Sequence, residues 1–152
     1  MKDWILKKLL KNVGQVGIII RSGQPGFVHR WLIYKIFKFR SVINLAHAPI
    51  TDKQDNSELK FCKRRNIPYY GYSFGAGGPQ PYESLAQTIL GLIGTLPGPV
   101  WIHCEGGKDR TGGIVMRWML NSGYSLESVI EQARKYKVPA EGWLRWALEL
   151  YE

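Results

Sequence analysis

Residues 100–120, VWIHCEGGKDRTGGIVMRWML, place a strand, a glycine-rich loop and a helix in immediate succession. The continuous apolar run at residues 100–103 is typical of a strand in the middle of a parallel sheet. The segment after Thr111 has helical character and ends at the break of residues 121–123. A short loop that enters a helix turns backbone N–H groups toward one point, and the helix N-terminus adds partial positive charge. The stretch therefore predicts an anion cradle at the carboxyl end of a central strand.

Apolar bursts alternate with amphipathic stretches through the rest of the chain. We expect further strands at residues 15–22, 41–46 and 67–72, and helices at 27–39, 56–66, 82–96, 126–136 and 141–152. The apolar residues 27, 28, 31, 32 and 36 form the expected buried face of the first of these helices. This order predicts an α/β fold, with a central, mostly parallel sheet of four to five strands flanked by helices. The 152 residues suit a single domain, 1–152.

The formal charge of +9 is concentrated near the start of the chain. Residues 1–40 carry nine basic side chains and one acidic side chain, and such an excess attracts anionic partners. Residues 1–14 read as a basic amphipathic helix that packs on its own domain. Contact of residues 1–40 with an anionic membrane surface is the alternative. The two cysteines and the absence of a long apolar run predict a reduced, cytoplasmic protein, either free or peripheral to a membrane.

The loop carries the side chains of a nucleophilic phosphate site. Cys104 lies at the base of the expected cradle, where the field that binds an anion also favours thiolate over thiol. Arg110 offers a planar fork for two phosphate oxygens. We expect Thr111 to donate a hydrogen bond to the sulfur and His103 to orient the loop. The expected phosphate-binding residues are Glu105, Gly106, Gly107, Lys108, Asp109 and Arg110, with Gly106 and Gly107 allowing close backbone approach.

His103, Cys104, Arg110 and Thr111 match the signature His-Cys-x5-Arg-Ser/Thr, which resembles that of the cysteine-dependent protein tyrosine and dual-specificity phosphatase superfamily. Residues 20–25, IRSGQP, are similar to a turn that supports the catalytic loop in compact members, so Ser22 is expected to be a supporting residue. The resemblance implies a phosphotyrosine protein phosphatase II-like fold and two-step hydrolysis through a phosphocysteine. It implies a phosphorylated protein, phosphoinositide or inositol phosphate as substrate, and not nucleic acid. We expect a monomer with no metal or other cofactor, because the three histidines are scattered along the chain.

The residue that protonates the leaving group is not obvious from the sequence. Most of the superfamily uses an aspartate on a loop before the signature, but residues 72–81, YSFGAGGPQP, contain no acid. Asp109 is our choice, because a carboxylate beside a bound phosphate is costly without a role. The motif CxxGKDRT also resembles that of myotubularins and some bacterial phosphatases, in which this aspartate is the general acid. Glu83 is the alternative acid. A catalytically weak or silent phosphate-binding module is the alternative function of the protein.

Two further residues have a structural and a functional interpretation. Glu58 lies early in an expected helix, where a carboxylate is usually an exposed partner of the helix dipole. Cys62 is expected to pack in the core, with a reversible disulfide to Cys104 as the alternative. Lys108 is similar to a lysine of phosphoinositide-hydrolysing members, and this resemblance implies a phosphoinositide substrate. Glu105, where some lipid phosphatases carry another lysine, weakens that inference.

Overall fold

The computed structural model describes residues 10, 12–46, 53–73, 83–139 and 142–149. Most of the amphipathic segment expected at residues 1–14, most of the acid-free loop at 72–81 and the end of the helix expected at 141–152 lie outside the described residues. Within the described ranges, no helix has the length and apolar character needed to cross a membrane.

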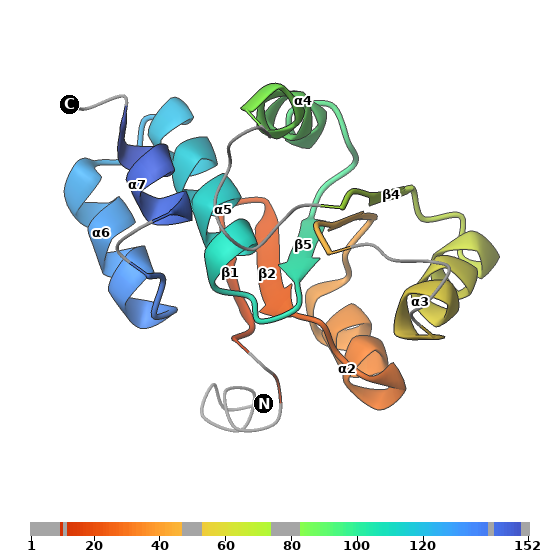
Figure 1. Cartoon of the computed structure of the whole chain (residues 1–152). Helices are drawn as coiled ribbons and strands as arrows, with labels where there is room; N and C mark the ends of the chain where they lie inside the picture. The colour runs from red at the N-terminus through yellow and green to blue at the C-terminus, as the bar shows by residue number, and fades with distance from the viewer. Residues whose placement is uncertain (1–9, 11, 47–52, 74–82, 140–141, 150–152) are drawn as a thin grey trace.

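The described residues contain a five-stranded sheet, which confirms the predicted α/β class (Figure 1). Its strands lie in the order β1-β2-β5-β3-β4, and all neighbouring pairs are parallel except β1 with β2. The strands are β1 (Gly14–Val16), β2 (Ile19–Gly23), β3 (Ser41–Asn44), β4 (Tyr69–Gly71) and β5 (Val100–Cys104). The single strand predicted at residues 15–22 is wrong, because the chain reverses at Gly17, which has a φ of +54°.

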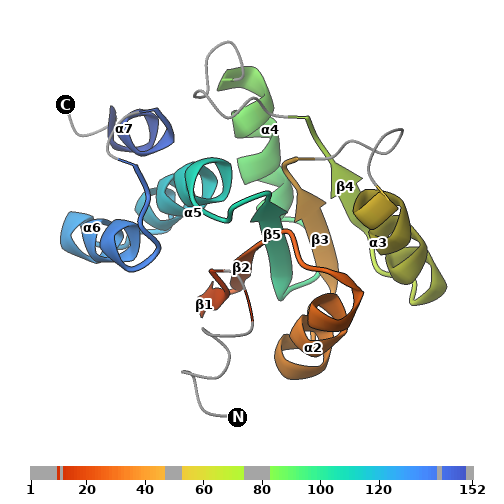
Figure 2. The ribbon, with the colours of Figure 1, turned by 60° about the horizontal axis from the view of Figure 1, so that its bottom comes forward.

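Helices cover both faces of the sheet, as Figure 2 shows. The helices α2 (Phe27–Phe37) and α3 (Lys53–Arg64) lie on one side. The other side carries α4 (Glu83–Ile93), α5 (Asp109–Asn121), α6 (Leu126–Lys135) and α7 (Trp143–Leu148). Two separate apolar cores result, one on each face.

The alternation of side chains along β5 divides its residues between these two cores. Ile102 and Cys104 belong to the core under α4, α5, α6 and α7. Trp101 belongs to the core under α2 and α3. His103 faces this same side, because its ring lies 4.4 Å from that of Trp101. The strand therefore presents Cys104 and His103 to opposite faces of the sheet.

The buried face of α2 differs from the predicted one. Phe27, Val28 and Trp31 are 56%, 70% and 47% exposed, whereas Arg30 and Ile33 are buried. Leu32 and Ile36 are half-buried. Residues 24–26 link β2 to the helix, and the side of the helix that carries Ile33 packs into the core under α2 and α3. An apolar surface is consequently left facing outward on α2.

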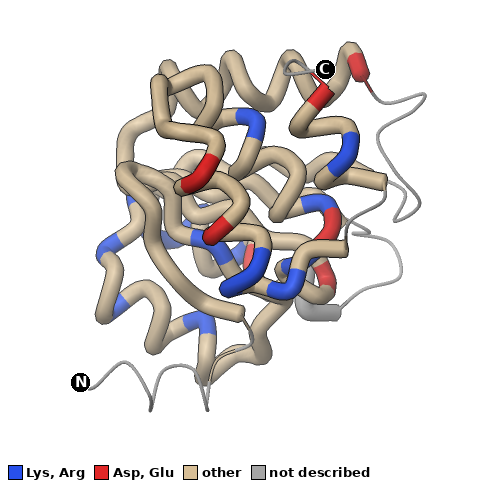
Figure 3. Tube along the Cα trace, turned by 90° about the vertical axis from the view of Figure 1, so that its left-hand side faces the viewer, with Lys and Arg blue, Asp and Glu red and all other residues tan. Residues whose placement is uncertain are grey.

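Charge is mixed on the side of the molecule where α6 and α7 lie, away from α2 and α3 (Figure 1). Figure 3, which looks onto that side, shows basic and acidic segments interspersed. Helix α6 alone carries Glu127, Glu131, Arg134 and Lys135. The described part of the chain is therefore not uniformly basic on its surface.

Candidate active site

The predicted cradle forms where β5 passes into α5. Strand β5 ends at Cys104, residues 105–108 form the loop, and α5 begins at Asp109. The Cys104 side chain is 1% exposed, and the backbone N–H of Gly107 donates a hydrogen bond to its sulfur over 3.3 Å. The loop thus turns back over the sulfur at the carboxyl end of the strand.

Three consecutive carbonyl groups of the loop are held from outside. The backbone N–H of Gln24 donates to the Glu105 carbonyl over 3.1 Å. The Asn12 side-chain amide donates to the Gly106 carbonyl over 2.7 Å, and Arg21 Nη2 donates to the Gly107 carbonyl over 2.9 Å. The C=O and N–H of a trans peptide point in opposite directions. Holding the carbonyl groups outward therefore directs the N–H groups into the loop, as an anion site requires.

Arg21 places a buried positive charge behind the loop. Burial lowers the pKa of its guanidinium to about 10, while Tyr136 and Cys104 act in the opposite direction. The guanidinium lies 3.9 Å from the centre of the Tyr136 ring. Its Nε and Nη1 atoms have no hydrogen-bond partner among the described residues. The charge is therefore poorly compensated, and an anion at Cys104 would offset that cost.

Gly107 is required by the conformation of the loop. It has a φ of +69°, a region that side chains with a Cβ rarely adopt. A Cβ there would lie 2.4 Å from the Gly23 nitrogen and 2.6 Å from the Ser22 carbonyl carbon. A Cβ on Gly106 would meet nothing within 4 Å, so the two glycines have different roles.

The start of α5 contributes the charged side chains of the site. Asp109 and Arg110 lie in its first turn and are half-buried, and the Lys108 N-cap makes no side-chain hydrogen bond to the helix. Lys108 is also half-buried, and Glu105 is exposed. The Thr111 hydroxyl is buried without a partner among the described residues, so the hydrogen bond expected from Thr111 to the sulfur is absent.

Glu58 is the residue whose place the sequence interpretation misjudged. It was expected at the surface, but both Glu58 and His103 are 0% exposed, with Glu58 Oε1 2.6 Å from His103 Nε2. Neither Glu58 Oε2 nor His103 Nδ1 has a partner among the described residues. The spacing of Glu58 and Cys62, both fully buried on one face of α3, was the available signal. Helix α3 therefore supports the residue that precedes Cys104.

The two candidate acids lie in different surroundings. Asp109 is part of the loop-to-helix junction, one residue before Arg110. Glu83 begins α4, accepts a hydrogen bond from Gln87 over 2.9 Å and accepts another from the indole N–H of Trp146. One of its oxygens is thus held within α4, and the other joins α4 to α7.

Ser22 and Cys62 both have structural contacts. The Ser22 hydroxyl accepts a hydrogen bond from the Trp101 indole and donates one to the Gly23 carbonyl, each over 2.8 Å. Cys62 lies in the core under α2 and α3, whereas Cys104 lies in the core on the other face. Burial raises the Cys62 thiol pKa to about 12. A disulfide needs its two β-carbons about 4 Å apart, which this arrangement across the sheet does not favour.

Comparison with known proteins agrees with this fold and loop. Residues 30–132 match the tyrosine phosphatase family, and the chain belongs to that family. It is similar to the inositol diphosphatase DSP3 of Arabidopsis thaliana, with 31% identity over 77% of this chain and 57% of the relative. It also matches the inositol diphosphatase SIW14 of Saccharomyces cerevisiae, with 24% identity over 90% of this chain and 49% of the relative. The chain thus spans about half the length of these two curated relatives.

Solved structures show the same fold. The core catalytic domain of the PP-IP phosphatase SIW14 from S. cerevisiae aligns with a TM-score of 0.67 and 22% identity, covering 94% of this chain and 86% of the other. TpbA of P. aeruginosa in complex with pTyr aligns with a TM-score of 0.67 and 15% identity, covering 90% and 80%. The fold of this chain is therefore that of the tyrosine phosphatase-like proteins.

Proposed function

We propose that this protein is a cysteine-dependent phosphatase and that Cys104 is its nucleophile. The observation that carries the proposal is the set of three outward-held carbonyl groups, which directs the loop N–H groups toward the side of the Cys104 sulfur. Family membership supports a phosphatase activity. An apolar pocket or a metal cluster would not require this arrangement, whereas a bound phosphate does.

The order of the loop residues supports a two-step reaction. The Cys104 sulfur attacks phosphorus and the bond to the leaving oxygen breaks, while Arg110 holds two of the remaining oxygens. Asp109 gives its proton to the leaving oxygen. Water then attacks the phosphocysteine, its proton passes to Asp109, and the sulfur leaves as the thiolate. Arg21 stabilises the thiolate at both stages through its buried charge.

We propose an inositol phosphate that carries a diphosphate group as the first substrate to test. The names of the DSP3 and SIW14 relatives support this class. The chemistry also agrees, because a phosphate leaving group, whose second pKa is about 6, is far less basic than an alcohol and needs less help from an acid. A phosphotyrosine protein and a phosphoinositide are the competing substrates. Membrane contact through residues 1–40, a cytoplasmic location and a monomeric state stay predictions.

Release of inorganic phosphate tests the proposal. The purified chain is incubated without metal with an aryl phosphate, a diphosphoinositol polyphosphate, a phosphotyrosine peptide and a phosphoinositide. We expect turnover of the aryl phosphate, fastest release from the diphosphate, and loss of all activity in Cys104→Ser. Phosphate binding by Cys104→Ser should persist, because the backbone cradle is unchanged. An inactive parent chain that still binds phosphate would establish the silent phosphate-binding module instead.

The leaving-group dependence tests Asp109. Asp109→Asn should slow phosphate esters with basic leaving groups by about 10²–10⁴-fold, the usual contribution of a general acid. The diphosphate and activated aryl phosphates should be slowed much less. Glu83→Gln is the matched variant, and the acid assignment moves to Glu83 if that variant reproduces the effect.

A further inference from the structure

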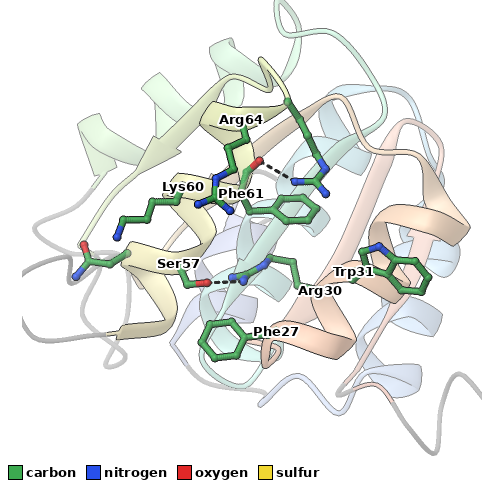
Figure 4. Close-up of a pocket in the computed structure, with 9 residues that line it drawn as sticks. Phe27, Arg30, Trp31, Ser57, Lys60, Phe61 and Arg64 are labelled. Carbon is green, nitrogen blue, oxygen red and sulfur yellow. Dashed lines mark hydrogen bonds between the residues drawn. The ribbon is translucent and has the colours of Figure 1, made fainter.

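A second charged hollow lies between α2 and α3, away from the helices that surround Cys104. It has a volume of about 580 Å³, within the range of ligand-binding clefts. Four of its lining residues are cations and three are aromatic (Figure 4). The cations are Arg30, Lys60, Arg64 and Arg65, and the aromatic residues are Phe27, Trp31 and Phe61.

The hollow continues toward the far ends of the same two helices. A neighbouring depression of about 440 Å³ shares Arg65 and adds Lys38 and Arg40 to the lining. Among the described residues that line the two depressions, none is an aspartate or glutamate. We call the two together the α2/α3 groove. Its single sign of charge contrasts with the mixed charge around α6 and α7 (Figure 3).

Aromatic rings contact two of the arginines of the groove, Arg30 and Arg65. The Arg65 guanidinium lies 3.8 Å from the centre of the Phe61 ring. Arg30 lies 5.4 Å from the rings of both Phe27 and Phe61 and donates a hydrogen bond to the Ser57 hydroxyl over 2.7 Å. Figure 4 shows this side chain between the two rings. Arginines fixed in this way lose little freedom when they bind an anion, which raises affinity.

The edge of the groove is apolar as well as basic. Phe27 and Trp31 line it while remaining about half exposed, and Val28 beside them is 70% exposed. An exposed apolar patch of this kind next to cations indicates a partner with both apolar and acidic groups.

We propose that the α2/α3 groove binds an acidic peptide segment of a partner protein, with carboxylates or phosphates on the cations and apolar side chains on the exposed rings. A flat bilayer does not fill a concave groove, and a small polyphosphate leaves Phe27 and Trp31 uncovered. Helix α2 has 11 residues and is about 16 Å long at 1.5 Å per residue. At about 3.3 Å per residue, an extended peptide of five residues spans this length.

The lining of the groove includes Phe27, the first residue of α2. Helix α2 starts at Phe27, three residues after Gln24, whose N–H holds the Glu105 carbonyl. A phosphoprotein bound in the groove would thus enter beside the loop. Peptide binding itself does not depend on Cys104 and stands whether or not the chain is a phosphatase.

Fluorescence anisotropy of labelled ligands tests the proposal on the full chain. The probe is a ten-residue peptide of alternating glutamate and leucine, compared with the same peptide carrying lysine for glutamate. A single-stranded oligonucleotide and phosphatidylserine vesicles are the other arms. We expect saturable binding of the acidic peptide and none of the basic one. We further expect Lys60→Glu/Arg64→Glu to weaken the acidic peptide at least about tenfold, in line with loss and reversal of two charge contacts.

Lys63→Glu is the matched control, since Lys63 is an exposed lysine on the same helix that does not line the groove. It should change peptide affinity less than about twofold, and all these variants should hydrolyse a small aryl phosphate at the parental rate. Equal weakening by Lys63→Glu would show a general charge effect and overturn the site. Absence of acidic-peptide binding, or tighter Lys60-dependent binding of the oligonucleotide or vesicles, would overturn the peptide as its ligand.

Discussion

Replacement of Glu58 tests whether α3 supports the loop of residues 105–108 from the far side of the sheet. Glu58 is fully buried on α3, and its Oε1 lies 2.6 Å from His103 Nε2. His103 in turn precedes Cys104 on β5. Two substitutions separate shape from charge, since Glu58→Gln keeps the volume and one hydrogen bond while Glu58→Ala removes both.

The size of the effect follows from burial. Removing the Glu58 side chain leaves His103 Nε2 buried without a hydrogen-bond partner, which costs about 1–3 kcal/mol. The truncation to alanine also leaves a cavity, which costs about 2–5 kcal/mol in a core. In Glu58→Ala, His103 would have both ring nitrogens unpartnered among the described residues, since Nδ1 already has no partner. Burial lowers the pKa of Arg30, and the nearby Glu58 charge partly opposes this effect. The substitution removes that opposing charge. We therefore expect Glu58→Ala to lose about 3–5 kcal/mol of unfolding free energy, and Glu58→Gln about 1–3 kcal/mol.

Urea unfolding followed by circular dichroism measures these losses. A double-mutant cycle with Glu58→Ala, His103→Ala and the double variant isolates the pair, and its coupling energy should be about 1.5–3 kcal/mol. Aryl phosphate hydrolysis is measured without urea, at a temperature where each variant is folded. We expect its rate to fall in Glu58→Gln mainly through kcat. That split is expected because His103 holds the backbone at Cys104 and contacts no substrate.

A coupling energy below about 0.5 kcal/mol would refute the reasoning, because independent sites give values of that size. Wild-type kcat in a folded Glu58→Gln protein would refute the claim that the pair positions the loop. Asn56→Ala on the same helix is a control for general loosening of α3, since Asn56 is exposed.

Two other residues give sharp expectations. Gly107→Ala forces a Cβ to within 2.4 Å of the Gly23 nitrogen at a φ of +69°, so it should destabilise the fold by about 3 kcal/mol. Gly106→Ala should shift the midpoint of urea unfolding little. Equal unfolding midpoints of the two variants would contradict this expectation. The Cys62 pKa is raised from 9.0 to about 12, so the fold keeps the neutral thiol and loses stability as pH rises from about 9 toward 12. At pH 8 only about one Cys62 in 10⁴ would be thiolate. Mass spectrometry should therefore find no iodoacetamide adduct on Cys62 in the native protein. Rapid labelling of Cys62 would contradict this expectation and show that the residue is accessible.

Much of the fold was predictable because periodicity reports local structure directly. The apolar run at residues 100–103 and the loop after it gave the position of β5 and of Cys104. The helical spacing of the apolar residues 85, 89, 92, 93 and 96 follows one side of the helix expected at 82–96, and Ile89 and Ile93 on that side are fully buried. These features depend on neighbours in the sequence, and tertiary contacts reinforce them.

The residues that hold the loop could not be found in this way. Asn12 and Arg21 reach the loop across separations of 94 and 86 residues, and nothing in their local sequence encodes those partners. The prediction of an exposed Glu58 is wrong because it relied on the usual solvation of carboxylates. The contact with His103, which stabilises the buried carboxylate, could not be seen in the sequence. For α2, both sides carry large apolar residues, so composition alone could not select the side of Ile33.

Helix α3 links the two sites, because adjacent residues in it serve each one. Ser57 accepts the hydrogen bond from Arg30 in the α2/α3 groove, and Glu58 contacts His103 behind the loop. The exposed side of the same helix carries Lys60 and Arg64. Variants on that exposed side should therefore change peptide binding alone, whereas Glu58 variants should change stability and turnover. A Lys60→Glu/Arg64→Glu protein with unchanged unfolding free energy and turnover but weaker peptide binding would separate the groove from the proposed catalytic loop.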